Sequence, residues 1–144
     1  AANFLLDLAL KVIPAESGSV LMSDISSEEL YFVAARGPKA QAVMQFRVPI
    51  GTGIVGFCVL HGVSLAVSDA HKDQHFYAKI SEQLGYQTQS LLCCPVQRDG
   101  RVFAAIELVN RQKGTMFEHD EVEALNFLAH EFGEYLVNTD QTGT

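Results

Sequence analysis

The feature that most constrains the fold is a pair of apolar runs joined by a short turn. Residues 88–97 and 102–109 are rich in aliphatic side chains, and the tetrapeptide RDGR separates them. Asp-Gly between two such runs is a strong signal for a two-residue hairpin turn, because both residues tolerate positive φ. A second hairpin is expected where residues 19–24 and 29–36 alternate in polarity around a short polar link. Two hairpins, one toward each end of the chain, predict a largely antiparallel sheet.

Helices are expected at both ends of the chain and in its middle. Apolar side chains recur at helical spacing over residues 3–13 and again over residues 118–138. Two shorter helical segments, 53–61 and 76–84, fall between the hairpins, where they can cover one face of the sheet. The sequence therefore predicts an α+β fold.

The composition fits one globular domain that binds neither nucleic acid nor a membrane. The 144 residues include 17 acids and 10 bases, a net charge of −7, whereas a nucleic-acid groove needs clustered Lys and Arg. No apolar run reaches the roughly 18 residues of a membrane span, and residues 5–10 lack the basic flank of a signal peptide. Because the chain begins at Ala1 rather than at Met, we expect a piece excised from a larger multidomain protein.

The three cysteines indicate a reducing compartment. Cys58, Cys93 and Cys94 cannot all pair, and adjacent cysteines rarely bridge. Free thiols fit the cytoplasm, which is the expected location. The Cys93–Cys94 pair lacks the C-x-x-C spacing of zinc and thioredoxin-type sites. Buried structural cysteines are therefore favoured over a metal or redox role.

A glycine pattern in the middle of the chain matches a dinucleotide-binding fingerprint without its setting. Gly51, Gly53 and Gly56 spell G-x-G-x-x-G. That turn needs a strand before it and an acid about 20 residues later, at the end of a second parallel strand. Here the run before Gly51 is interrupted by Pro49, and the first acid is Asp69, too close for a full crossover. A Rossmann site is therefore not predicted.

Read with its flanks, this segment resembles the centre of a GAF domain, a small-molecule sensor module of signalling proteins. The resemblance covers residues 17–136, and seven pieces occur in the family's order: SVLMSD, ELYFVAARG, VPIGTGIVGFCVLHG, a loop with Asp69, Asp73 and Phe76, LLCCPV, AAIELVNR and FEHDE. It implies a GAF/PAS-like α+β fold with a central antiparallel sheet of about six strands. The terminal helices would lie on one face and the pocket helices and loops on the other, in a single domain over residues 1–144.

The resemblance implies a non-catalytic regulatory sensor domain of a signal-transduction protein. Such a domain binds a small molecule and relays its state through its terminal helices to an adjacent effector domain. The pattern is closest to the cyclic-nucleotide-binding branch, so a cAMP or cGMP receptor domain is one alternative. A ligand-free dimerisation or protein-interaction module is another. A third is the GAF-like free methionine sulfoxide reductase, which uses pocket-loop cysteines; residues 69–89 contain none, and Cys58 has no obvious partner thiol or adjacent base.

Glu107 is the leading candidate for contact with a ligand. It lies in the apolar run AAIELV, and an acid in an apolar strand must be paired, hydrogen-bonded or facing a wet cavity. A solvated position near a sheet edge is the alternative. In the branch that the chain resembles, a glutamate on this strand lies in the ligand pocket. The candidate ligand-binding residues are Ser19, Arg36, Ile54, Val55, Phe76, Thr88 and Glu107.

Other pocket positions depart from that branch. An aromatic residue that covers the base is Ala35 here, followed by Arg36 where an acid is familiar. An aspartate and a threonine of the mid-chain helix are Ser81 and Leu84. These changes remove stacking area and polar contacts worth about 1 kcal/mol each. Weak or altered purine recognition is therefore expected.

A motif near the C-terminal helix resembles the N-K…F…D-E motif of the same branch. Its members here are Asn110, Arg111, Phe117 and Asp120, with Arg in place of Lys and a spacing from Phe117 to Asp120 that is one residue short. The resemblance implies a structural ion pair between Arg111 and Asp120.

The C-terminal helix carries an apolar stripe with the +3, +4 spacing of a heptad seam. The stripe can pack on the sheet of its own chain or on a second copy, and both can hold together. We expect it to meet the N-terminal stripe and to form a homodimer. The predicted seam residues are Leu5, Leu8, Val12, Val122, Leu125, Ala129, Phe132 and Leu136.

Acid and imidazole alternate over Asp69, His71, Asp73 and His75, a donor set that can bind a divalent metal. Because Asp69 and Asp73 are typical loop residues of the family, capping roles are favoured and no metal is predicted. No cysteine is followed by the histidine typical of a bilin site. A small molecule or cyclic nucleotide is the only ligand class expected.

Overall fold

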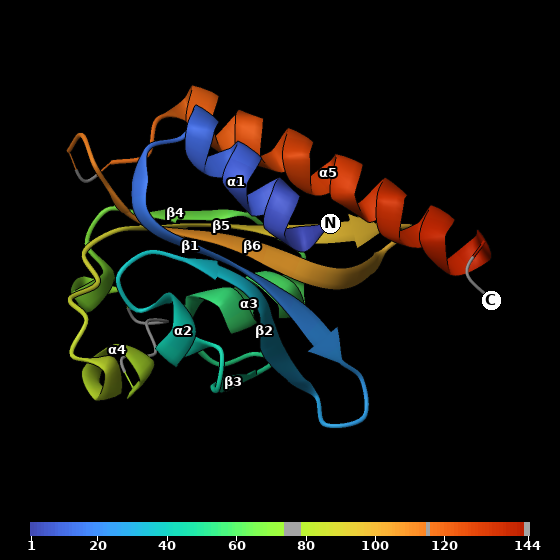
Figure 1. Ribbon diagram of the computed structural model, residues 1–144, viewed down its shortest axis with the longest axis horizontal. Helices are drawn as coiled ribbons and strands as arrows, with labels where there is room; N and C mark the ends of the chain where they lie inside the picture. Colours follow the sequence, from blue (N-terminus) through green and yellow to red (C-terminus); the bar gives the residue numbers. More distant parts are fainter. Residues whose placement is uncertain (74–78, 115, 143–144) are drawn as a thin grey trace.

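The computed structural model describes residues 1–73, 79–114 and 116–142, which form one curled sheet with helices on both faces (Figure 1). The six strands have the order β3-β2-β1-β6-β5-β4, and every neighbouring pair is antiparallel. The predicted α+β class and antiparallel sheet are therefore confirmed. The strands are β1 (Ala15–Asp24), β2 (Glu29–Arg36), β3 (Arg47–Pro49), β4 (Leu65–Val67), β5 (Leu91–Arg98) and β6 (Arg101–Arg111).

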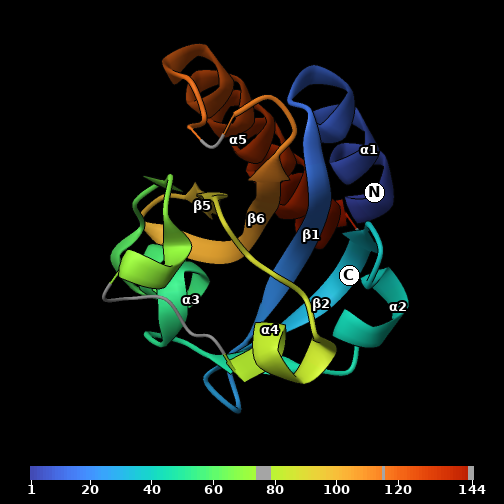
Figure 2. The same ribbon diagram turned by 90° about the vertical axis from the view of Figure 1, so that its left-hand side faces the viewer.

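The two terminal helices lie side by side on one face of the sheet, and short helices cover the other face (Figures 1 and 2). The terminal helices are α1 (Ala2–Val12), over β1 and β2, and α5 (His119–Thr142), over β5. Among the described residues no helix has the length and apolar character that crossing a bilayer requires. The opposite face carries α2 (Ala40–Val43), α3 (Gly53–His61), the 3-10 turn η1 (Ala70–Lys72) and α4 (Lys79–Leu84).

The hairpin between β5 and β6 sets the register of the middle of the sheet. Asp99 and Gly100 have φ of 54° and 77°, as a two-residue turn of this kind requires. From there the ladder places Glu107 opposite Cys93 of β5 and, on its other side, opposite Ser19 of β1. Directly paired residues project from the same face of a sheet. The three side chains therefore share the face that the short helices cover.

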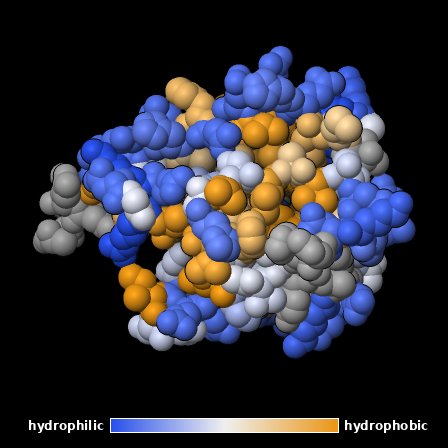
Figure 3. All heavy atoms as spheres, turned by 180° about the vertical axis from the view of Figure 1, so that it is seen from behind, coloured by the Kyte–Doolittle hydropathy of each residue, from blue (hydrophilic) through white to orange (hydrophobic). Residues whose placement is uncertain are grey.

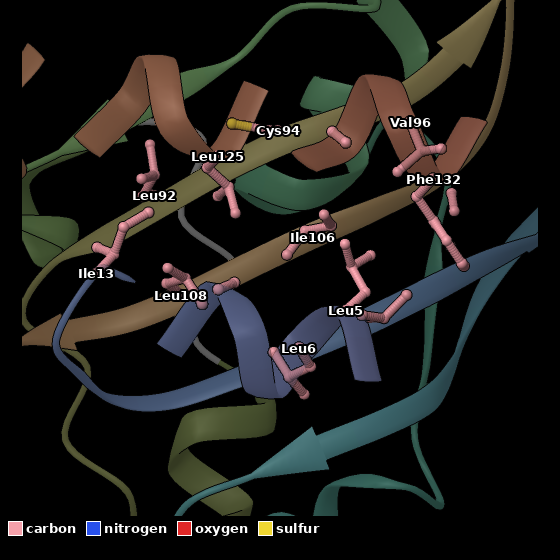
Figure 4. Close-up of a cluster of buried hydrophobic side chains, with 14 of the residues drawn as sticks. Leu5, Leu6, Ile13, Leu92, Cys94, Val96, Ile106, Leu108, Leu125 and Phe132 are labelled. Carbon is pink, nitrogen blue, oxygen red and sulfur yellow. The ribbon is translucent and has the colours of Figure 1, made fainter. Parts of the chain in front are cut away.

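The main core lies between the sheet and the terminal helices (Figure 4). Leu6 of α1 and Leu125 of α5 are fully buried against the sheet, where Ile106 and Leu108 of β6 meet them. In β6 these two residues alternate with residues that face the other side. Burial of Ile106 and Leu108 under the helices therefore fixes the face from which Glu107 projects.

Much of the predicted dimer seam packs in the core of the same chain, which is one of the two arrangements that the heptad spacing allows. The structure buries Leu5, Leu125, Ala129 and Phe132 against their own sheet, so these side chains are not available to a second copy. The physical reason is that a helix on a sheet needs the same apolar stripe as a helix in a coiled coil. Val122 and Leu136 pack at the margin of this core, while Leu8 and Val12 are 37% and 54% exposed.

The ion pair at the start of α5 differs from the predicted one. Arg111 binds Glu121 with two hydrogen bonds, Nε to Oε1 at 2.7 Å and Nη2 to Oε2 at 3.0 Å. Glu121 also accepts a hydrogen bond at 2.8 Å from the backbone N–H of Glu118, which precedes the helix. Asp120 is exposed, because one helical residue rotates the side-chain direction by about 100°. The expected Arg111–Asp120 pair is therefore replaced by Arg111–Glu121.

The face formed by α3 and β4 carries apolar side chains at its centre, framed by hydrophilic ones (Figure 3). Leu60 and Val63, at the end of α3 and just after it, are 58% and 41% exposed. The terminal helices also carry exposed apolar side chains, among them Phe4, Val12 and Phe127. Among the described residues, exposed apolar side chains thus occur on both layers of helices.

The core assignment predicts different costs for two apolar residues of the predicted seam. Leu125→Ala should lower the free energy of unfolding by about 2–5 kcal/mol, because it leaves a cavity under α5. Val12→Ala should change it by no more than about 0.5 kcal/mol, because Val12 is 54% exposed. Urea unfolding of dilute protein, followed by circular dichroism, measures both. Equal costs would contradict the assignment of Leu125 to the core.

Candidate functional site

A cavity of about 120 Å³ lies between the sheet and the short helices. The sheet side of the cavity is lined by residues of β1, β2 and β6, and the opposite side by residues of α2, α3 and the segment from α4 to β5. Figure 2 shows how these elements are arranged. A volume of this size exceeds the space of a single water molecule several-fold. The lining residues are Ser17, Gly18, Ser19, Phe32, Ala35, Arg36, Lys39, Ala40, Val43, Val48, Thr52, Gly53, Ile54, Val55, Ile80, Leu84, Tyr86, Thr88, Leu91, Glu107 and Val109.

The polar floor of the cavity is centred on Glu107. Its carboxyl faces the cavity from the middle of β6 and is hydrogen-bonded with Ser19, its cross-strand partner. Burial raises the pKa of Glu107 to about 7, and the Ser19 hydrogen bond opposes that rise only in part. The cations that line the cavity are Arg36 and Lys39. Arg36 binds Asp7 of α1 at 2.8 Å (Nε to Oδ1), so its charge is already paired.

The α3 wall explains the glycine pattern of this segment. Ile54 and Val55, in the first turn of α3, are 3% and 7% exposed and line the cavity. Gly53 begins the helix with a φ of 74°, a conformation that favours glycine. A Cβ on Gly56 would lie 2.8 Å from the carbonyl oxygen of Pro49. The glycines therefore serve a tight turn between β3 and α3, in an antiparallel sheet rather than a Rossmann unit.

The structure brings six of the seven predicted ligand-binding residues to this one cavity. They are Ser19, Arg36, Ile54, Val55, Thr88 and Glu107. The seventh, Phe76, lies outside the described residues. Glu107 is on a central strand, so the alternative of a solvated edge position is wrong. That these residues bind a ligand stays a prediction.

Sequence reasoning missed Tyr86, the aromatic residue that the segment between α4 and β5 contributes to the cavity. Its hydroxyl binds Ser17 at 2.7 Å and Asn110 at 3.2 Å, and it also donates to Glu16. The only signal in the sequence is a lone tyrosine in a polar stretch, LGYQTQ, without a periodic pattern. Its three partners are 24 to 70 residues away in the chain, so spacing alone could not reveal them.

The cysteines and the acid–imidazole segment form no second site among the described residues. Cys58 and Cys93 hydrogen-bond in the core beneath α3, so the expectation that Cys58 has no partner thiol is wrong. The hydrogen bond with Cys58, together with burial, raises the pKa of Cys93, which suppresses the reactive thiolate. Within the described ranges no group of His, Cys, Asp and Glu is arranged to hold a metal. His75 lies outside those ranges.

The six-stranded antiparallel sheet with helices on both faces defines an α+β domain with a cavity on one side of the sheet, and the comparison with protein families defines it further. The GAF domain model matches residues 2–136, so the chain belongs to the GAF domain family. A Takifugu rubripes dual 3',5'-cyclic-AMP and -GMP phosphodiesterase 11A is 30% identical over 125 residues, 73% of this chain and 14% of that protein. A Caenorhabditis elegans probable 3',5'-cyclic phosphodiesterase, pde-5, is 25% identical, over 81% of this chain and 17% of that protein. The chain thus spans less than a fifth of these two relatives.

Solved structures show the same fold at low identity. The GAF domain of a Coxiella burnetii phosphoenolpyruvate-protein phosphotransferase has a TM-score of 0.87 at 17% identity, covering 99% of this chain and 84% of that one. The free methionine-R-sulfoxide reductase of Neisseria meningitidis has a TM-score of 0.81 at 18% identity, covering 98% and 78%. Proteins of different function share this fold, so these likenesses establish architecture alone.

The buried Glu107 carboxyl predicts a specific pH dependence of stability. Its pKa is about 7 in the folded state against 4.5 unperturbed. Because the folded domain binds this proton more tightly than the unfolded chain does, protonated Glu107 contributes stability. That contribution is fully present below pH 4.5 and is lost as pH rises through 7. Glu107→Gln should therefore gain stability relative to the native chain between pH 4.5 and 8, by at most on the order of 3 kcal/mol. Parallel urea titrations across this range measure the difference, and a constant difference would contradict the buried carboxyl.

Proposed function

We propose that this GAF domain is a non-catalytic regulatory sensor that binds a small molecule in the cavity and relays its state through α1 and α5. The observation that carries the proposal is a largely apolar cavity lined by the Glu107 carboxyl and by the buried hydroxyls of Ser19 and Thr88. Apolar walls with a few convergent polar groups are typical of small-molecule sites. The effector that receives the signal would be another domain of the full-length protein.

Two ion pairs link the cavity region to the terminal helices and support a relay. Arg36 lines the cavity and binds Asp7 of α1. At the same end of the sheet, where β1 begins, Arg111 of β6 binds Glu121 of α5. A ligand that shifts β2 or the end of β6 would act on both helices through these pairs. The size of such a shift is limited by the ligand's differential affinity for the two packings.

A cyclic nucleotide receptor is the second candidate, because two relatives are described as phosphodiesterases of cyclic nucleotides. The lining residues argue for altered recognition. Ala35 and Leu84 line the cavity where that branch has an aromatic residue and a threonine. Loss of a stacking ring and of a polar contact lowers affinity by about tenfold each.

A titration series tests both candidates. Cyclic AMP, cyclic GMP and a panel of nucleosides, amino acids and organic acids are added to ¹⁵N-labelled protein, and hits are measured by isothermal titration. We expect a hit to shift the amides of Ser19, Thr88 and Glu107 and to lose at least about tenfold in affinity on Glu107→Gln. Cyclic AMP and cyclic GMP should bind with dissociation constants above ~1 μM, which corresponds to a binding free energy of less than ~8 kcal/mol in magnitude. Nanomolar binding of either would favour the receptor, and no hit at millimolar concentrations would favour a ligand-free module.

We also propose that the domain forms a dimer through the exposed side of α1 and α5. Leu8 and Val12 of α1 and Phe127 and Tyr135 of α5 are 37% to 62% exposed on this layer. Two copies that meet there would bury these side chains while each keeps its own core.

Sedimentation tests this assembly. The domain should sediment as a dimer at tens of micromolar, and the double variant Leu8→Glu/Val12→Glu as a monomer. Ile25→Glu is the matched control, because Ile25 is 71% exposed on the turn between β1 and β2. A native chain that sediments as a monomer would mean that α5 is only a core helix.

A further inference from the structure

The wall segment, defined as residues 85–90 between α4 and β5, closes one side of the cavity without regular secondary structure. Tyr86 and Thr88 from this segment line the cavity. A segment of this kind has no helical or strand hydrogen bonds of its own to hold it in place. Its position therefore depends on the few contacts that tie it to the sheet.

Tyr86 supplies the first of these ties. Its hydroxyl donates to the Glu16 carboxylate and is bound by Ser17 at 2.7 Å and by the Asn110 amide at 3.2 Å. Burial and the Glu16 carboxylate raise the pKa of Tyr86 to about 12, so the phenol keeps its proton at neutral pH. The ring lies against the cavity while the hydroxyl is anchored on β1 and β6.

The Asn110 side chain supplies three further ties, beside the backbone N–H groups of Ala70, which binds the Gln89 carbonyl, and of Arg111, which binds the Ser90 hydroxyl. Its Oδ1 accepts from the backbone N–H of Gln89 at 2.7 Å and of Ser90 at 3.2 Å, and its Nδ2 donates to the Gln87 carbonyl at 2.9 Å. Asn110 has a φ of 60°, a left-handed conformation that asparagine tolerates better than most residues. One amide side chain thus binds the backbone of three residues of the wall segment and the hydroxyl of a fourth.

The anchors stand where both terminal helices join the sheet. Glu16 and Ser17 lie at the start of β1, a few residues after α1. Asn110 is followed directly by Arg111, which binds Glu121 in the first turn of α5. A movement of the wall segment would therefore act on both junctions.

We propose that Tyr86, with Glu16, Ser17 and Asn110, forms a latch that holds the wall segment closed over the cavity, with Tyr86 as the positioning residue. The proposal rests on the proposed function in one respect, namely that the cavity admits a small molecule. Release of the latch opens the wall, and closure restores the aromatic wall and the contacts at both helix junctions. Tyr86 thereby controls both access to the cavity and its link to the helices.

Hydrogen exchange of the free domain tests the latch without any ligand. Tyr86→Phe keeps the ring and removes only the hydroxyl, and it should raise amide exchange in α4 and the wall segment about tenfold. The amides in the middle of β5 and β6 should keep their native rates. Ser17→Ala should give a smaller increase in the same segment. Tyr31→Phe is the matched control. It removes the hydroxyl of a β2 tyrosine whose ring packs under Arg47, and it should leave amide exchange unchanged both in the wall segment and in the middle of β5 and β6. Native exchange rates in Tyr86→Phe would overturn the latch.

A second measurement separates the latch from the proposed function. Indole, a flat neutral probe, is titrated into native protein, Tyr86→Phe and Tyr86→Leu and followed by the amide shifts of Ser19 and Glu107. Tyr86→Leu should bind indole at least about fivefold more weakly than Tyr86→Phe, because only the leucine variant loses the aromatic wall. Equal affinities of the two variants would contradict the positioning role of the ring. If indole and the nucleotide panel leave the native amides unmoved, the proposed function fails, and hydrogen exchange still decides the latch.

Discussion

Burial of β6 on both faces is the constraint on which the rest of the structure depends. Its even-numbered residues Ile106 and Leu108 face the terminal helices, and Ala105 and Val109 face α3. Because side chains alternate along a strand, a shift of register by one residue would exchange the two sets. The Asp99–Gly100 turn and the two antiparallel partners prevent such a shift. The register therefore keeps the Glu107 side chain on the cavity face of the sheet.

The same strand carries the link between the cavity and the helices. Glu107 lies in its middle, and Asn110 and Arg111 lie at its end, three and four residues further on. Asn110 binds the wall segment, and Arg111 binds α5 through a pair of which both side chains are largely buried, 11% and 13% exposed. Because packed strands deform little, a shift of the strand at Glu107 would also shift Asn110 and Arg111. The cavity, its wall and α5 are thus contacted by Glu107, Asn110 and Arg111, which lie within five consecutive positions of β6.

Much of the fold could be predicted from local signals, and the failures have physical reasons. The Asp-Gly turn, the alternating runs and the glycine-rich segment each report on neighbouring residues, so β5, β6 and α3 lie where the sequence placed them. The apolar stripe of α5 reports only that one helix face is covered, and it is silent about whether a sheet or a second helix covers it. The choice of Glu121 over Asp120 by Arg111 depends on the helix start, and helix ends are the least predictable part of an element.

The candidate site divides in the same way. Glu107 was identifiable because an acid in an apolar strand is a local conflict, which points to a special environment. Tyr86 was not, because its role depends on partners that only the fold brings together, as with the contact between Cys58 and Cys93. Polar residues without a local pattern are thus the ones for which three-dimensional information is indispensable.

A buried carboxyl with a raised pKa lowers the stability of the empty domain at neutral pH, and an apolar residue at the same position would avoid that loss. Ser19 offsets the loss only in part. A bound group that donates a hydrogen bond to Glu107 would recover it, since such a bond lowers the pKa and restores the ionised form. A ligand that donates such a hydrogen bond would therefore gain binding free energy equal to the stability that Glu107 costs the unbound domain. This relation gives a physical reason for a carboxyl in the middle of a buried strand.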